Sequence, residues 1–177
     1  MTSLLDQLGA TEPAPDLKPD LYGRLLGVWD VANHYFLEDG RDAGQWVDGT
    51  VVWTFGRVLG GRAVQDVMWF TAPGPDGYPV RETGSTMRLF DPVAGAWHVV
   101  WFSPAGRVAA LVGRPGEHGD IVQEGVRPDG RAIRWVFTEL TDDSFRWLGH
   151  ISDDGGRSWR LEQEMLARRR GPASPPG

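Results

Sequence analysis

The sequence predicts an all-β domain that closes into an antiparallel up-and-down barrel of about eight to ten strands. Short runs of alternating apolar and polar residues recur about every ten residues, as strands do. Gly, Pro and Asp mark a turn between nearly every pair of runs. No long helical period remains to make the crossovers of a parallel sheet. Because a meander leaves no exposed edge when it closes, we expect a barrel, with a two-sheet sandwich as the alternative.

The chain is expected to start with little regular structure. A short helix is expected around Leu5 to Leu8 and another over Asp20 to Leu26, with Asp20 as N-cap and Gly27 ending it. The expected domain limits are 1–20 for a flexible arm, 21–169 for the barrel and 170–177 for a disordered tail.

Ten strands follow, each bounded by turn residues. Leu59-Gly60-Gly61 predicts a tight hairpin, because its glycines accept positive φ. Pro128-Asp129-Gly130 and Asp153 to Gly156 predict two further turns. The expected strands are Val28–Leu37, Trp46–Val58, Arg62–Thr71, Arg81–Phe90, Ala96–Phe102, Arg107–Arg114, Asp120–Val126, Ala132–Leu140, Phe145–Ser152 and Ser158–Ala167.

Composition argues against several classes of function. A net charge of −6 argues against a nucleic-acid-binding protein, which usually carries the opposite sign. Without cysteine the chain forms neither disulfides nor thiolate metal sites. No run of about 18 apolar residues predicts a membrane helix. The first residues lack the basic start and apolar stretch of a secretory signal, so we expect a cytoplasmic protein.

Nine tryptophans can fill a core, line a pocket, or do both. Side chains alternate between the two faces of a strand, and the simplest assignment turns the Trp-bearing faces inward. A pocket with mostly apolar walls and a few polar groups is typical of a small-molecule site. A β-bulge would reverse the assignment of any one strand. The expected ligand-binding residues are Asn33, Tyr35, Trp53, Phe55, Gln65, Trp69, Trp97, Trp101, Trp135 and Trp147.

The strand Ala96–Phe102 is apolar on both faces apart from His98. Its outer face is therefore expected to be covered, or to form the contact of a homodimer.

The start of the first strand, Leu26-Gly27-Val28-Trp29, resembles the Gly-x-Trp start of lipocalins and the wider calycin barrels. The resemblance implies that Trp29 closes one end of the barrel against an Arg from a late strand, here Arg160 or Arg168.

Two further segments, Gly49 to Trp69 and Asp153 to Arg160, are similar to a lipocalin-like bacterial family of unknown function. This resemblance covers roughly Leu25 to Arg169 and implies the barrel but no particular reaction. Ser152-x-Asp154-x-Gly156-x-Ser158-Trp159 also resembles an Asp-box, a hairpin turn that is structural in other folds. We interpret it here as a structural turn.

No motif predicts a metal or a cofactor. The four histidines show no metal-ligand spacing, and alternation turns His150, the one candidate haem ligand, away from Trp147. No nucleophile elbow or phosphate loop occurs. The candidate acid, base or charge-stabilising residues are Tyr35, Asp66, Arg88 and His98. Outward-facing salt bridges are expected for Asp66, Arg88, Glu162 and Glu164, with an inward acid/base or ion-pair set as the alternative.

Three functions remain open. The first is binding of a small, mostly hydrophobic or aromatic molecule in the barrel. The second is a cofactor-independent cyclase or isomerase of secondary, polyketide-like metabolism that uses the same cavity. The third is a filled core in a protein that acts by association. A filled core predicts no cavity above about 300 Å³. A binding protein predicts unshifted polar groups there, and an enzyme predicts a carboxyl or His of perturbed pKa.

Overall fold

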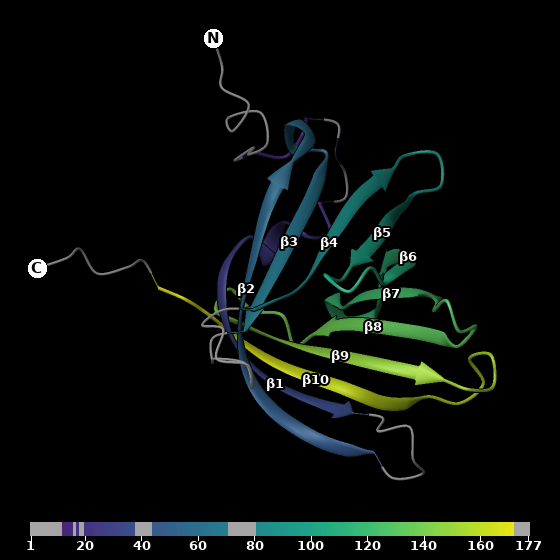
Figure 1. Ribbon diagram of the computed structural model, residues 1–177. Helices are drawn as coiled ribbons and strands as arrows, with labels where there is room; N and C mark the ends of the chain where they lie inside the picture. Colours follow the sequence, from purple (N-terminus) through teal and green to yellow (C-terminus); the bar gives the residue numbers. More distant parts are fainter. Residues whose placement is uncertain (1–11, 16, 18–19, 38–43, 71–80, 172–177) are drawn as a thin grey trace, which may run out of the picture.

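The computed structural model describes residues 12–15, 17, 20–37, 44–70 and 81–171. Ten antiparallel strands form a closed barrel, in which each strand pairs with the next along the chain and β1 pairs with β10 (Figure 1). The strands are β1 (Gly27–Leu37), β2 (Gln45–Val58), β3 (Ala63–Phe70), β4 (Arg81–Asp91), β5 (Ala96–Phe102), β6 (Val108–Pro115), β7 (Ile121–Val126), β8 (Ala132–Thr138), β9 (Ser144–Ser152) and β10 (Arg160–Arg169). The predicted fold class is confirmed.

The barrel closes along β1 and β10, whose pairing runs from Trp29 opposite Arg169 to Tyr35 opposite Gln163. Each of the ten described strands has a neighbour on both sides, so the barrel lacks the open sheet edge at which strands of other chains can add. The helical structure of the described residues consists of three 3₁₀ turns, η1 (Gly23–Leu25), η2 (Leu59–Gly61) and η3 (Glu117–Gly119). None of the described helices is long and apolar enough to cross a membrane.

The helix expected over Asp20 to Leu26 is a single 3₁₀ turn, η1, and the predicted N-cap is wrong. Asp20 does not cap the turn, because its carboxylate accepts hydrogen bonds at 2.5 and 3.1 Å from the buried guanidinium of Arg57. Just before it, Ala14 and Leu17 are buried against the core, and the Ala14 amide donates to the Gly61 carbonyl. The helix expected at Leu5 to Leu8 and most of the expected tail lie outside the described residues.

Trp29 closes one end of the barrel, as the Gly-x-Trp resemblance implied. Its indole is buried and donates to the Leu25 carbonyl at 2.7 Å. Arg169, rather than the expected Arg160 or Arg168, lies over the ring, 4.1 Å from its centroid. Gly27 has φ +115°, and a Cβ there would lie 2.7 Å from the Arg169 guanidinium. The motif therefore needs Gly both for its backbone and for the space that the arginine occupies.

The Trp-bearing faces of β2, β5, β8 and β9 point inward, as alternation predicted, but β3 is reversed. Val64 and Asp66 are buried, whereas Trp69 is 39% exposed. The register with β2 explains the reversal, because Asp66 lies opposite the inward Phe55. Paired residues of neighbouring strands project to the same side of a sheet.

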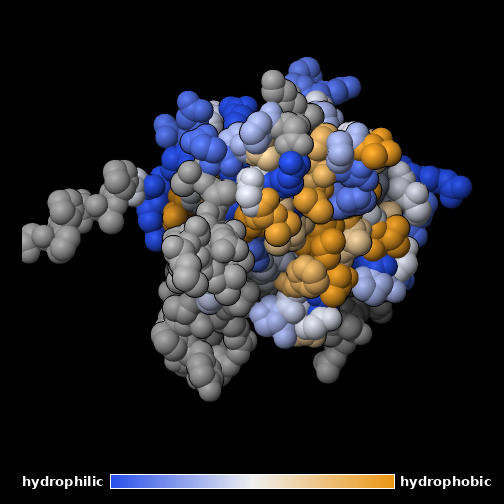
Figure 2. All heavy atoms as spheres, turned by 90° about the horizontal axis from the view of Figure 1, so that it is seen from above, coloured by the Kyte–Doolittle hydropathy of each residue, from blue (hydrophilic) through white to orange (hydrophobic). Residues whose placement is uncertain are grey.

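Several hydrophobic side chains remain on the outer surface of the barrel. Phe102 and Val108 are paired residues on β5 and β6, and both are more than two-fifths exposed. Seen from above the view of Figure 1, hydrophobic side chains gather in a continuous area bordered by hydrophilic ones (Figure 2). The homodimer expected from the apolar outer face of β5 stays a prediction.

Candidate functional site

A cavity of about 650 Å³ lies inside the barrel and extends to the end at which the β5–β6 and β7–β8 turns lie. This volume exceeds the limit of about 300 Å³ expected for a filled core, so the third functional hypothesis loses its support. The cavity has three parts: a wall of indole rings, a polar floor and a charged mouth.

Four tryptophans from β5, β8, β9 and β2 form the wall. Trp101 and Trp135 meet edge to face with ring centroids 6.3 Å apart, and Trp135 is 5.8 Å from Trp147. Trp147 in turn lies 6.3 Å from Trp53. Each separation is typical of a favourable aromatic pair, so the rings fix one another into a continuous surface.

Two glycines make room for this wall. A Cβ at Gly84 on β4 would lie 2.4 Å from Nε1 of Trp101, and one at Gly149 would lie 2.8 Å from the ring of Trp147. Both indoles therefore pass close to bare backbone, and a side chain at either glycine would push the ring from its place in the wall.

The floor is a buried ion pair between neighbouring strands. Arg88 Nη1 donates to Asp66 Oδ2 at 2.6 Å, and the Thr86 amide donates to Asp66 Oδ1 at 3.1 Å. Both charged side chains are only 2% exposed. The Arg88 guanidinium also lies 5.1 Å from the ring of Tyr22 and 5.4 Å from that of Phe55. Burial of both charges is tolerated because each is paired and hydrogen-bonded. The outward salt bridges expected for Asp66 and Arg88 are therefore wrong, because the register of β3 turns Asp66 inward.

Below the floor, Tyr22 fills the space against the closed end. Its ring meets Trp97 edge to face at 5.0 Å, and Gly113 leaves space for its hydroxyl. Burial raises the pKa of Tyr22 despite the opposing charge of Arg88, so the phenol stays neutral.

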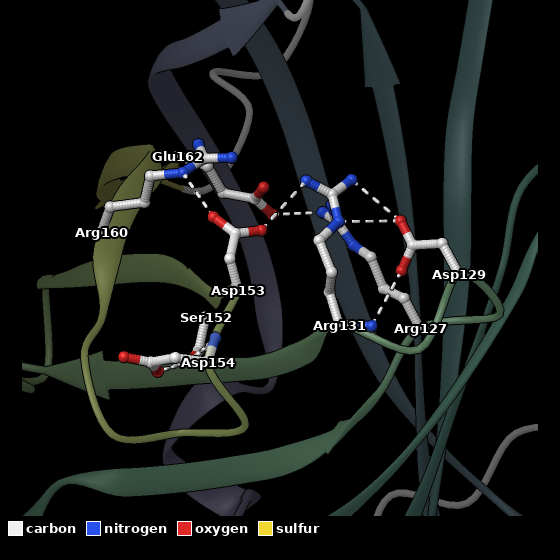
Figure 3. A network of polar contacts seen from close by, with 8 residues as sticks. All are labelled: Arg127, Asp129, Arg131, Ser152, Asp153, Asp154, Arg160 and Glu162. Carbon is white, nitrogen blue, oxygen red and sulfur yellow. Dashed lines mark hydrogen bonds and ion pairs between the residues drawn. The ribbon is translucent and has the colours of Figure 1, made fainter.

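The mouth carries a network of charges from the β7–β8 turn, the β9–β10 turn and the start of β10 (Figure 3). Arg127 forms an ion pair with Glu162. Arg131 forms one with Asp129 at 2.8 Å and contacts Asp153 at 3.8 Å. Arg127, Asp129, Arg131 and Glu162 all line the cavity.

Glu162 faces the cavity because β10 is irregular. Its pairing with β9 shifts between Leu161 and Gln163, so Glu162, Gln163 and Met165 all reach the cavity. Burial raises the pKa of Glu162, while Arg127, Arg160 and Arg131 oppose the shift. The outward salt bridge expected for Glu162 is therefore wrong, whereas Glu164 does pair outside the cavity, with Arg146 at 2.7 Å. Alternation alone gave no sign of this irregularity.

Five of the ten expected ligand-binding residues line the cavity, namely Tyr35, Trp53, Trp101, Trp135 and Trp147. The other five lie elsewhere. The Asn33 amide oxygen accepts a hydrogen bond from Gln163, and Gln65 bonds Ser85 on β4. Trp69 is on the outside, Phe55 packs in the core beside Trp53, and Trp97 lies below the floor.

Of the four candidate reactive residues, Tyr35, Asp66 and Arg88 line the cavity. His98 lies outside it, with a side chain that is 61% exposed and paired with Asp91. Arg107 and Arg127 also line the cavity, although sequence reasoning did not select them. A basic residue beside each of two turns at the same end of the barrel was the signal that could have identified them.

The turn after β9 is held by Asp154. Its Oδ1 accepts the amides of Arg157 and Ser158 at 2.9 and 2.8 Å, and its Oδ2 accepts the Ser158 hydroxyl. These bonds lower the pKa of Asp154 to about 2. Asp154 does not line the cavity, and the neighbouring Asp153 reaches Arg160 at 3.6 Å, so the turn orders one side of the charged mouth.

No family model and no curated protein matches the sequence. Among solved structures, the barrel is similar to that of the S-type phycobiliprotein lyase CPES from Guillardia theta, with a TM-score of 0.60 and 10% sequence identity. The match covers 86% of this chain and 92% of that chain. At so low an identity the likeness is one of fold, and the fold of this chain is a lipocalin-like, ten-stranded barrel.

Proposed function

We propose that this protein binds a small, mostly hydrophobic or aromatic molecule inside the barrel. The observation that carries the proposal is the arc of four indoles around a cavity of about 650 Å³. A volume of this order accommodates a small organic ligand. Flat aromatic rings stack well against indoles, and each such pair adds to the stabilisation from buried area.

The solved neighbour supports the proposal at the level of fold only. A protein named a phycobiliprotein lyase has a similar fold. Because one fold serves many functions, the neighbour's activity does not transfer to this chain.

Binding can be tested with the neutral fluorescent probe N-phenyl-1-naphthylamine and a matched pair of variants. Ala109 is buried and lines the cavity, whereas its neighbour Ala110 is exposed on the outer face. The Ala109→Phe variant is expected to lose probe binding and energy transfer from tryptophan, and Ala110→Phe to retain both. Equal binding by the two variants would show that the probe does not enter the barrel. Native mass spectrometry of the purified protein would identify a ligand that co-purifies.

The second candidate function, cofactor-independent isomerisation or cyclisation, is favoured by Glu162. Its carboxyl faces the cavity and its pKa is raised, which is the condition set out above for an enzyme. Tyr35, Asp66 and Arg88 would be the further candidates for proton transfer and charge stabilisation. Loss of hydrogen–deuterium exchange at an acidic carbon of a bound ketone in Glu162→Gln, with its affinity kept, would support this function. Retention of exchange in that variant would exclude Glu162 as the base.

Three further attributes stay proposals: membership of the lipocalin-like bacterial family, which rests on the sequence resemblance, a role in secondary metabolism and a cytoplasmic location. The assignment of Ser152 to Trp159 as an Asp-box is likewise a proposal. The Asp154 hydrogen bonds described above support it.

A further inference from the structure

The charges around the cavity do not cancel. Among its described lining residues, Asp66 pairs with Arg88, Asp129 with Arg131, and Glu162 with Arg127. Arg107, in the β5–β6 turn, is the fourth lining arginine and forms no ion pair within the described part of the chain. Arg107 is exposed at the rim of the cavity, and a surplus cation at that place in a protein of net charge −6 points to an anionic occupant.

Arg107 is also placed over the wall. Its guanidinium carbon lies 5.9 Å from the centroid of the Trp101 ring, at the end of the indole arc. A ligand ring that stacks along the arc would therefore carry a substituent into reach of this guanidinium. The indole beneath it confines the arginine and leaves its N–H groups available to an acceptor.

Arg127 offers a second cation. Among the described residues its ion-pair partner is Glu162, and a ligand anion could take the place of that carboxylate. The side chains of Arg127 and Glu162 are 30% and 15% exposed, so the pair is largely removed from water. A buried carboxylate is costly to keep charged, and the pKa of Glu162 is raised accordingly. Arg131 is less available, since three bonds join its backbone and guanidinium to Asp129.

We infer that Arg107 and Arg127 form a subsite for the acidic group of the ligand, with Glu162 as an internal counterion that this group displaces. The ligand class is then a flat, mostly aromatic molecule with one carboxylate or sulfonate at its edge. Arginine suits such a group because its planar fork donates two parallel hydrogen bonds. The inference rests on the proposed binding function and specifies which molecules the cavity selects.

Two probes that share one skeleton separate the inference from the function on which it rests. N-phenyl-1-naphthylamine is neutral, and 8-anilinonaphthalene-1-sulfonate carries a sulfonate in addition. The wild-type protein is expected to bind the sulfonate about tenfold more tightly, which corresponds to one charge-assisted bidentate contact. Equal affinities would overturn the inference and leave the binding function intact. Failure of both probes to respond to Ala109→Phe would overturn both.

Variants of the mouth then test the assigned residues. Arg107→Gln and Arg127→Gln are each expected to lower the ratio of sulfonate affinity to neutral-probe affinity about threefold to tenfold. Glu162→Gln is expected to strengthen sulfonate binding, because the competing carboxylate is gone. The matched control is Arg114→Gln, which removes the same charge from an exposed position on β6. An equal effect of Arg114→Gln would show a general charge effect and overturn the subsite.

If Arg127→Gln does not fold, Arg127→Gln/Glu162→Gln removes the pair together and is expected to show the same loss of sulfonate preference.

Discussion

Arg169 on the last strand, β10, lies over the ring of Trp29 on the first strand, β1, with its guanidinium carbon 4.1 Å from the ring centroid. The same guanidinium donates to the Leu26 carbonyl at 2.6 Å and to the Arg24 carbonyl at 3.1 Å. Its Nε donates to the Asp142 carbonyl at 2.5 Å. The side chain of Arg169 therefore donates hydrogen bonds to backbone carbonyls of the η1 segment and of the β8–β9 turn. It also covers Trp29, which closes this end of the barrel.

Replacement of Arg169 is expected to destabilise the fold more than its partial exposure suggests. Arg169→Ala should lower the free energy of unfolding by about 2–4 kcal/mol, because a cation–π contact and several charged hydrogen bonds are lost together. Urea denaturation followed by tryptophan fluorescence measures this. The control is Arg168→Ala, one residue earlier and exposed on the outer face, which is expected to cost less than about 1 kcal/mol. Equal losses in the two variants would contradict a special role for Arg169.

Disruption of the Asp66–Arg88 pair in the floor should be more harmful than removal of both partners. Asp66→Leu leaves an arginine that is 2% exposed without its counter-charge, which is expected to cost about 3–5 kcal/mol. Asp66→Leu/Arg88→Met replaces both charges with apolar groups and is expected to recover most of that loss. A double-mutant cycle in urea measures the coupling. A double variant less stable than Asp66→Leu alone would contradict this account.

The fold could be predicted from the sequence because strand alternation and turn residues act locally. The Gly27-Val28-Trp29 start and the regular turns were sufficient for a closed barrel. The partner of Trp29 was harder to predict from the sequence, because Arg160, Arg168 and Arg169 are chemically alike. The register between β1 and β10 decides among them. That register depends on the whole circumference of the barrel, which no short motif encodes.

The wall of the cavity was predicted better than its polar groups. Trp53, Trp101, Trp135 and Trp147 were identified because large apolar residues on alternating positions point inward. Trp69 was placed wrongly, because the register of β3 against β2 turns Asp66 inward and Trp69 outward. Glu162 was placed wrongly because the shift in pairing on β10 changes which side chains reach the cavity. Both errors concern the register between strands, which the local pattern of apolar and polar residues does not determine.

Gly84 is expected to control the shape of the wall. In Gly84→Ala the new Cβ would lie 2.4 Å from Nε1 of Trp101 and 2.8 Å from the Phe102 carbonyl, so the indole must move. Overpacking of this kind costs about 1–3 kcal/mol, and the displaced ring should weaken binding of N-phenyl-1-naphthylamine. The control is Gly56→Ala on β2, where nothing lies within 4 Å of the added atom. Unchanged probe affinity in Gly84→Ala would show that Trp101 does not contact the ligand.

Glu162 is expected to make the stability of the protein depend on pH in a direction opposite to that of most carboxyl groups. Its pKa in the unfolded chain is near 4.5, and burial raises it in the folded protein. Between these two values the folded state holds a proton that the unfolded state has released. The contribution of Glu162 to stability therefore falls as the pH rises from 4.5 through the folded pKa, and it is constant above that pKa.

This contribution is isolated by comparison with Glu162→Gln, because the lowered pKa values of Asp154 and Asp129 give the wild-type protein the opposite trend. The stability of Glu162→Gln relative to wild type should rise with pH across that window in urea denaturation between about pH 4 and pH 8. Glu164→Gln, which removes a carboxylate from the outer face of the same strand, controls for the loss of a surface ion pair. A relative stability of Glu162→Gln that falls with pH would mean that Arg127, Arg131 and Arg160 together outweigh burial. The carboxylate would then be a stable part of the mouth and not a counterion that a ligand displaces.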